Sequence, residues 1–119
     1  MPTPLTLCRL EAIPEGSSKG FVADPTAYYA DILVVRTREG VYAYRNRCPH
    51  TGAPMEGQPD QFLDYTGTLI QCGIHAAQFR IQDGYCIAGP CGGCYLQKVA
   101  ITVRDGAVIA LEDIARHDD

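Results

Sequence analysis

The sequence contains no tryptophan, and only three phenylalanines and three histidines occur among its 119 residues. No stretch approaches the roughly 20 apolar residues of a membrane-spanning helix. The N-terminus has neither the basic start nor the apolar run of a signal peptide. We therefore expect a cytoplasmic protein without a membrane segment, in which tyrosines supply most of the aromatic bulk.

Positive charge is also scarce. Ten lysines and arginines stand against 14 aspartates and glutamates, which gives a net charge of −4, and no basic cluster is present. Nucleic-acid binding is therefore not expected as a main role, whereas an acidic surface suits docking onto a basic protein patch. The length is that of a single domain, here residues 1–119.

Glycine and proline are abundant, with 12 and 8 residues, which favours turns over long helices. Runs of β-branched and aromatic residues predict strands that pair as hairpins across short loops containing glycine. The predicted pairs are 32–37 with 41–45, 79–82 with 85–87 across Asp83-Gly84, and 99–103 with 107–111 across Asp105-Gly106. Residues 5–9 are expected to form an edge strand, and 61–65 a single turn of helix. The predicted class is all-β, a small antiparallel sandwich or barrel.

Two stretches, about 47–60 and 71–78, interrupt this strand pattern, and each has a histidine close behind a cysteine. They contain Cys48-Pro49-His50 and Cys72-Gly73-Ile74-His75, which together use two of the three histidines. The third, His117, lies in a polar tail and is expected to be solvated. Six cysteines in a reducing compartment indicate metal binding more than a disulfide framework.

Three interpretations of these two motifs remain open. Buried cysteines beside hydrogen-bonded histidines would need no metal. Zinc accepts two cysteines and two histidines, although zinc fingers usually pair cysteine with cysteine and histidine with histidine. Here each loop offers one of each, an arrangement that suits two metal atoms, with both cysteines on one iron and both histidines on the other.

The motifs and their surroundings resemble the Rieske family, in which histidine replaces cysteine on one of the two irons of a 2Fe-2S cluster. Residues 45–52 resemble the first cluster loop, 79–84 the strand and turn after the second, and Gly89-Pro90 the start of the proline loop. The resemblance covers about residues 5–111. It implies a Rieske-like fold with a small cluster-binding subdomain of two ligand loops at about 46–95, and one 2Fe-2S cluster per chain. The implied ligands are Cys48, His50, Cys72 and His75, with the histidines nearer the surface as the electron exit.

Departures from the high-potential form of the family predict the redox potential. Ala53 and Ile74 occupy the places of a disulfide, and Ala77 and Phe79 replace the serine and tyrosine that hydrogen-bond to the cluster. Fewer donors make the cluster harder to reduce, so we expect a potential near about −150 mV. Ala76 replaces a glycine common in the family, which would cost about 1 kcal/mol if that position needs a positive φ.

The remaining cysteines leave several possibilities. Cys91-Gly-Gly-Cys94 is a Cys-x-x-Cys motif, and with Cys86 it has the spacing of plant-type ferredoxins, although a fourth cysteine downstream is missing. Free thiols are favoured over an oxidation-prone pair and over a second cluster. Tyr28 and Tyr29 precede a strong strand and are expected to pack in the core or at a sheet edge rather than form a partner site.

The resemblance also implies a function. Apart from His117 in the polar tail, the chain has no further histidine for a mononuclear iron site, and it has no nucleotide-binding glycine pattern. It is similar to the free-standing Rieske ferredoxins of bacterial ring-hydroxylating dioxygenase systems, which are not catalytic themselves. Those ferredoxins pass single electrons from a flavin-dependent, NAD(P)H-oxidising reductase to a terminal oxygenase. We expect the present chain to act as a monomer or weak dimer. The implied docking face centres on Pro49, His50, Thr51, His75 and Pro90. The alternatives are a small subunit of an assimilatory nitrite reductase and a zinc-stabilised interaction module.

Overall fold

The computed structural model describes residues 4–49, 52–56, 58–73, 77–89 and 92–115. Within these ranges the chain is nearly all β, which confirms the predicted class. No helix in this part is long and apolar enough to cross a membrane. The elements are β1 (Leu5–Arg9), the 3-10 helix η1 (Leu10–Ala12), β2 (Ser17–Phe21), β3 (Ile32–Arg36), β4 (Val41–Arg45), β5 (Leu69–Gln71), β6 (Gln78–Arg80), β7 (Cys86–Ala88), β8 (Ile101–Arg104) and β9 (Ala107–Ala110).

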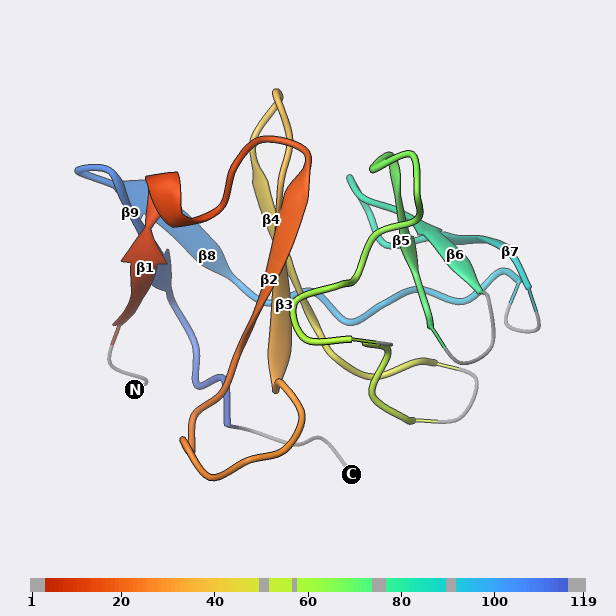
Figure 1. Cartoon of the computed structure of the whole chain (residues 1–119), viewed down its shortest axis with the longest axis horizontal. Helices are drawn as coiled ribbons and strands as arrows, with labels where there is room; N and C mark the ends of the chain where they lie inside the picture. The colour runs from red at the N-terminus through yellow and green to blue at the C-terminus, as the bar shows by residue number, and fades with distance from the viewer. Residues whose placement is uncertain (1–3, 50–51, 57, 74–76, 90–91, 116–119) are drawn as a thin grey trace.

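The strands form three antiparallel sheets of three strands each, in the orders β1-β9-β8, β2-β3-β4 and β5-β6-β7, and the three sheets follow one another across Figure 1. The first two sheets are joined through the segment before β8. The Val99 amide donates to the Ala43 carbonyl at 3.0 Å, and the Arg45 amide donates to the Gln97 carbonyl at 2.8 Å. The first two sheets therefore form a common frame, and the third sheet extends from it. As predicted, β1 is an edge strand of its sheet.

Strand β3 is buried on both faces and separates two apolar cores. Leu33 and Val35 pack in one core, while Ile32 and Val34 pack in the other, and all four are 0% exposed. Because successive side chains of a strand point to opposite faces, a continuous apolar run is what a strand between two cores requires. The core that contains Leu33 and Val35 also contains the two cysteines of the predicted cluster loops.

The three predicted hairpins form, but one has a different turn. The first hairpin pairs β3 with β4, and β8–β9 turns through Asp105 and Gly106 with φ values of 54° and 76°. This two-residue loop with two positive φ angles is the turn that Asp-Gly favours. In contrast, β6 and β7 are short and are joined by residues 81–85, of which only Gly84 has a positive φ, at 75°. The expected two-residue turn at 83–84 is therefore wrong.

The helical turn expected at 61–65 is also wrong. Gln61 and Leu63 instead form isolated β-bridges with Gln58 and Ile70. The Gln71 amide donates to the Phe62 carbonyl at 2.8 Å, and the Phe62 side chain is fully buried. Pairing with β5 and burial of one aromatic side chain therefore override the local preference for a turn.

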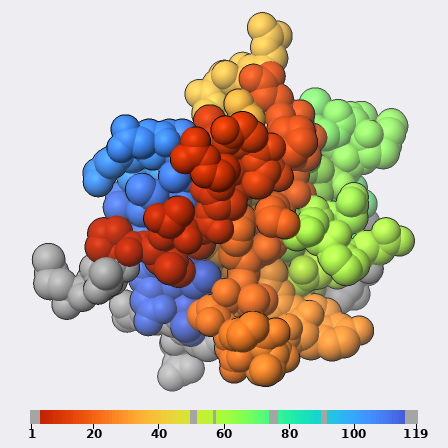
Figure 2. Space-filling view, turned by 60° about the vertical axis from the view of Figure 1, so that its left-hand side comes forward, coloured from red at the N-terminus to blue at the C-terminus, as the bar shows by residue number. Residues whose placement is uncertain are grey.

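Tyr28 and Tyr29 are not packed in the core, contrary to the expectation. They lie in the loop between β2 and β3, which is orange and protrudes from the molecule in Figure 2. Tyr28 is 90% exposed and Tyr29 is 49% exposed. The two rings meet edge to face, with centroids 4.7 Å apart, so each packs against the other.

Candidate metal centre

The first cysteine loop leaves the end of β4 and is closed by hydrogen bonds of its own backbone. The Cys48 amide donates to the Ala53 carbonyl at 2.8 Å, and the Gly52 amide donates to the Cys48 carbonyl at 2.6 Å. Gly52 has a φ of 78°, a left-handed conformation that glycine adopts at low cost. Cys48 is completely buried, whereas Pro49 is exposed. The loop therefore turns its cysteine inward and its next residue outward.

The second cysteine loop leaves β5 and closes in the same manner. The Cys72 amide donates to the Ala77 carbonyl at 2.9 Å, so in both loops the cysteine amide bonds to the carbonyl five residues later. Cys72 and Ala77 are both completely buried. The two loops thus present their cysteines through equivalent local structures, although their motifs differ in spacing.

The two loops meet in one apolar core. The Gly73 amide donates to the Met55 carbonyl at 2.8 Å, which ties the second loop to the end of the first. Cys48 and Cys72 belong to the same buried cluster, together with the fully buried side chains of Met55 and Phe79. Two buried cysteines in one core fit the cysteine side of an iron–sulfur cluster, because thiolates are the ligands that iron takes in these centres.

The segment after β7 lies against the second loop. Gly89 has a φ of 99°, and a Cβ atom added to it would come within 2.7 Å of the Ala77 Cα. Only glycine therefore lets the two backbones approach so closely here. This is where the sequence predicts the start of a covering proline loop, next to the second ligand loop.

Several predicted site residues fall outside the described part of the chain, so the structure places two of the four predicted ligands. Those outside are His50, Thr51, Ile74, His75, Ala76, Pro90, Cys91 and His117. Within the described ranges, no group of three or more histidine, cysteine, aspartate or glutamate side chains is arranged to hold a metal ion. The full ligand set thus remains a prediction, with its two cysteines brought together by the fold.

The other described cysteines differ from this pair. Cys86 is buried in the same core, and its thiol donates to the Ala88 carbonyl at 3.2 Å. Its backbone amide donates to the carbonyl of Cys94, whose side chain is exposed. Cys8 lies on β1, in contact with the opposite core, and burial raises the pKa of its thiol. The different surroundings of Cys86 and Cys94 favour separate thiols over a second cluster.

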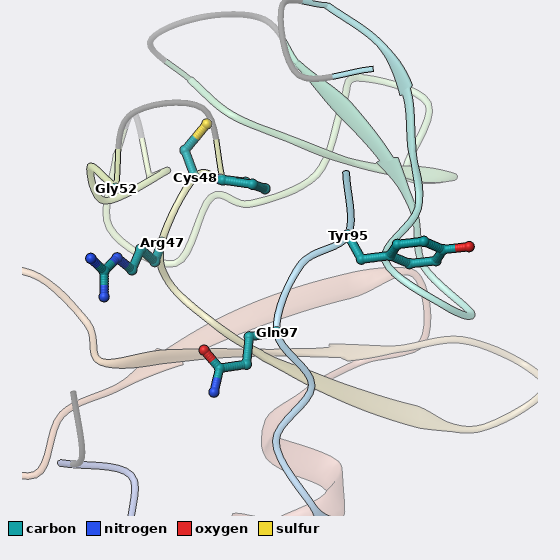
Figure 3. A pocket seen from close by; sticks show the side chains of 6 residues that line it. Arg47, Cys48, Gly52, Tyr95 and Gln97 are labelled. Carbon is teal, nitrogen blue, oxygen red and sulfur yellow. The ribbon is translucent and has the colours of Figure 1, made fainter. Parts of the chain in front are cut away.

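A hollow of about 310 Å³ opens beside the first loop (Figure 3). In this view the side chains of Arg47 and Tyr95 point in opposite directions, with the Cys48 loop above Gln97. The hollow is lined by Arg47, Cys48, Pro49, Gly52, Tyr95 and Gln97.

Sequence reasoning missed a buried polar network next to the first loop. Asn46 is 7% exposed, and its Oδ1 accepts from the Met55 amide at 2.8 Å. Its Nδ2 donates to the Ala30 carbonyl at 3.0 Å and to Glu56 Oε1 at 2.6 Å. Burial raises the pKa of Glu56, and the hydrogen bonds from Ala30 and Asn46 partly oppose this. The one signal of this network in the sequence is the position of Asn46, an amide residue between strand β4 and the motif that begins at Cys48.

Comparison with known proteins identifies a family and a distant relative. The family model for the Rieske [2Fe-2S] domain matches residues 3–99. Over 81 residues the chain is 37% identical to cholesterol 7-desaturase nvd from Xenopus laevis. That alignment covers 67% of this chain but only 16% of the relative, so the chain is similar to one part of a much longer protein.

Solved structures of similar fold include ferredoxins and a putative nitrite reductase small subunit. The ferredoxin of carbazole 1,9a-dioxygenase from Nocardioides aromaticivorans IC177 superposes with a TM-score of 0.71 at 23% identity, covering 93% of this chain and 99% of that one. The Sphingomonas yanoikuyae B1 ferredoxin gives 0.67 at 27% identity, with 91% and 97% covered. A putative NADH-dependent nitrite reductase small subunit from Mycobacterium tuberculosis gives 0.64 at 22% identity, with 92% and 95% covered. At 23% and 22% identity, the carbazole dioxygenase ferredoxin and the nitrite reductase subunit show only that the fold is shared.

Proposed function

Because the chain belongs to the Rieske [2Fe-2S] domain family, we propose that it is a low-potential one-electron carrier that serves a terminal oxygenase. Its cofactor is a Rieske-type 2Fe-2S cluster, which when bound accepts and releases a single electron. We further propose that Cys48 and Cys72 hold one iron and that His50 and His75 hold the other. The pair of buried cysteines, each at the start of an equivalently closed loop, supports this assignment most directly.

The surroundings of the two cysteines support a potential at the low end of the family range. Ala77 carries no hydroxyl group where high-potential members have a serine, and the fully buried Phe79 is a hydrocarbon ring where they have a tyrosine. The reduced cluster carries one more negative charge than the oxidised cluster. An apolar core with few side-chain donors stabilises that charge poorly, so we expect a potential near about −150 mV.

The partners we propose are a flavin-dependent reductase as electron donor and a ring-hydroxylating oxygenase as acceptor. The similarity to ferredoxins along nearly their whole length supports a carrier of this kind. The exposed Pro49 beside the buried Cys48 supports a docking face at the tip of the ligand loops. Similarity to a nitrite reductase small subunit supports that system as a second candidate.

A visible and EPR spectrum of the purified protein, with an iron assay and a redox titration, tests the cofactor and its potential. We expect about two irons per chain, loss of colour on reduction and a lower average g-value than all-cysteine clusters give. A colourless protein that contains zinc would overturn the assignment, and a clearly positive potential would overturn the low-potential proposal. Cys48→Ser should lose the coloured centre, whereas Cys94→Ser should keep it.

Electron-transfer rates measured with purified partners distinguish the two candidate systems. The reduced protein is mixed either with a ring-hydroxylating oxygenase or with the large subunit of a nitrite reductase. Fast, saturable oxidation by the oxygenase alone supports the proposal, whereas oxidation by the nitrite reductase alone favours the second candidate.

A further inference from the structure

Asn46 has an amide side chain that is almost completely buried and hydrogen-bonded to two separate segments. One is the β2–β3 loop, at the Ala30 carbonyl, and the other is the end of the first loop, at the Met55 amide and the Glu56 carboxylate. A buried amide is costly unless its polar atoms find partners, so such a residue is retained where its bonds fix a conformation. Asn46 also lies two residues before Cys48 and directly follows β4.

The contacts of Asn46 form a continuous connection between the two cysteine loops. Its Oδ1 accepts from the Met55 amide, and the Met55 carbonyl in turn accepts from the amide of Gly73, the residue after Cys72. Met55 is fully buried, so water does not replace either bond without opening the core. The Asn46 side chain is therefore linked to the backbone of the second loop through a single residue, Met55.

We propose that Asn46 is a positioning residue for the cluster, which holds the Cys48 loop and the Cys72 loop in their relative places through Met55. Glu56 is its charged partner. This inference rests on the proposed function only in that the two loops are taken to bind the cluster.

Glu56 orients the Asn46 amide group. Its Oε1 accepts from Asn46 Nδ2 at 2.6 Å and from the Ala30 amide at 3.2 Å. The Asn46 nitrogen faces this carboxylate, which leaves its oxygen directed at the Met55 amide. Hydrogen bonds to an ionised acceptor are the stronger ones, so the carboxylate selects one of the two orientations of the amide.

Asn46→Ala is the primary test variant. Removing a group that orients a metal ligand typically lowers metal affinity by about 10–100-fold, so the loaded variant should release its cluster to an iron chelator faster by a similar factor. Its EPR g-values and potential should shift, because the two loops no longer hold one relative position. Hydrogen exchange at the amides of Met55 and Gly73 should accelerate, while exchange at the β3 amides should not.

Thr37→Ala provides a matched control at the other end of the β3–β4 hairpin. The Thr37 hydroxyl accepts from the amides of Glu39 and Gly40 in the turn, at 3.1 and 3.3 Å, and donates to the Gly40 carbonyl at 3.3 Å. The substitution therefore removes three side-chain-to-backbone hydrogen bonds. It should lower stability without changing chelator release, EPR or potential. A general loss of stability is thereby separated from a loss of loop position.

A charge-preserving pair of substitutions tests the same contact independently. Asn46→Asp places two carboxylates against each other, whereas the Asn46→Asp/Glu56→Gln double variant restores one donor and one acceptor at that contact. The double variant should therefore release its cluster more slowly than the single Asn46→Asp variant. This comparison tests the positioning role of Asn46 even if the Asn46→Ala variant does not fold.

Equal chelator release and equal amide exchange in Asn46→Ala and Thr37→Ala would overturn the positioning role. So would a double variant that performs no better than Asn46→Asp. A colourless wild-type protein would instead refute the proposed function. The exchange rates of the Met55 and Gly73 amides would in that case still show whether Asn46 joins the two loops.

Discussion

Tyr44 connects the frame formed by the first two sheets to the third sheet, β5-β6-β7. Removing its hydroxyl group should destabilise the protein measurably. Tyr44 lies on β4 and is fully buried, and its hydroxyl donates to the carbonyl of Ile81 at 2.6 Å. A Cβ atom added to Gly84 would come within 2.9 Å of the Tyr44 ring, so the ring fills its site without spare volume. Tyr44→Phe keeps this packing and deletes one hydrogen bond.

The expected cost follows from the carbonyl that is left behind. Ile81 is 2% exposed, so its carbonyl loses a partner in a place that water does not readily reach. Leaving such a buried acceptor unsatisfied costs about 1–3 kcal/mol. The free energy of unfolding of Tyr44→Phe should therefore fall by that amount at neutral pH.

The same residue gives a pH dependence with a defined sign. Burial, followed by the charge of Asp83, raises the pKa of Tyr44 to about 12 from its usual 10.0. Because the folded state holds the proton more tightly than the unfolded state, this stabilisation is complete below pH 10. It is then lost as the pH rises towards about 12. Tyr44→Phe should lack this part of the alkaline decline.

Urea unfolding at neutral and alkaline pH measures both effects, with the slope m expected to stay constant because the buried area barely changes. Tyr65→Phe is the matched control, because the Tyr65 side chain is fully exposed. Its effect should remain within about 0.5 kcal/mol. If Tyr44→Phe and Tyr65→Phe have the same stability at neutral pH, the connecting role assigned to the Tyr44 hydroxyl is refuted.

Three further substitutions test other features. Gly89→Ala should cost at least about 1 kcal/mol in urea unfolding and lower the yield of coloured protein, because φ is 99° and the new Cβ would meet Ala77. Arg45→Met should cost about 1–3 kcal/mol by the same assay, because its buried guanidinium donates to two carbonyls of the C-terminal segment. Asp83→Asn should flatten the acid side of the stability profile, because the hydrogen bond from Arg80 lowers the pKa of Asp83. That stabilisation is present above the usual pKa and is lost as pH falls through the lowered one.

Each of these expectations has a plain counter-result. Wild-type stability in Gly89→Ala would mean that the backbones separate without cost. An unchanged urea midpoint in Arg45→Met would mean that the C-terminal segment does not depend on the guanidinium. Superimposable acid unfolding curves for Asp83→Asn and wild type would show that the ion pair between Arg80 and Asp83 does not contribute to stability in acid.

Features with a strong local signal could be predicted from the sequence. The run 32–37 predicts a strand because it is rich in β-branched and apolar residues and precedes a short loop with glycine. The structure has this strand at Ile32–Arg36, buried between two cores. Asp105 and Gly106 predict their turn because both tolerate a positive φ. The motif spacing and the resemblance to the Rieske family predict Cys48 and Cys72 as ligands, and the fold places both in one core.

Features that depend on distant partners could not be predicted. Strand β2 has the sequence Ser-Ser-Lys-Gly-Phe, which has little strand preference and pairs because β3 offers it a complete partner. The Asn46 network joins residues 30, 46, 55 and 56, and no local pattern shows that these segments meet. The exposure of Tyr28 likewise depends on where its loop leaves the frame.

The closure of each cysteine loop by the amide of its own cysteine bears on how the protein matures. Rings of a few residues cost little entropy to close, and both closures use only backbone groups within their own loop. The apoprotein should therefore present Cys48 and Cys72 in place before iron arrives. Zinc fingers, by contrast, gain their fold only with the metal. A cell could then store this chain folded and load it late, or reload it after oxidative loss of the cluster, without refolding the chain.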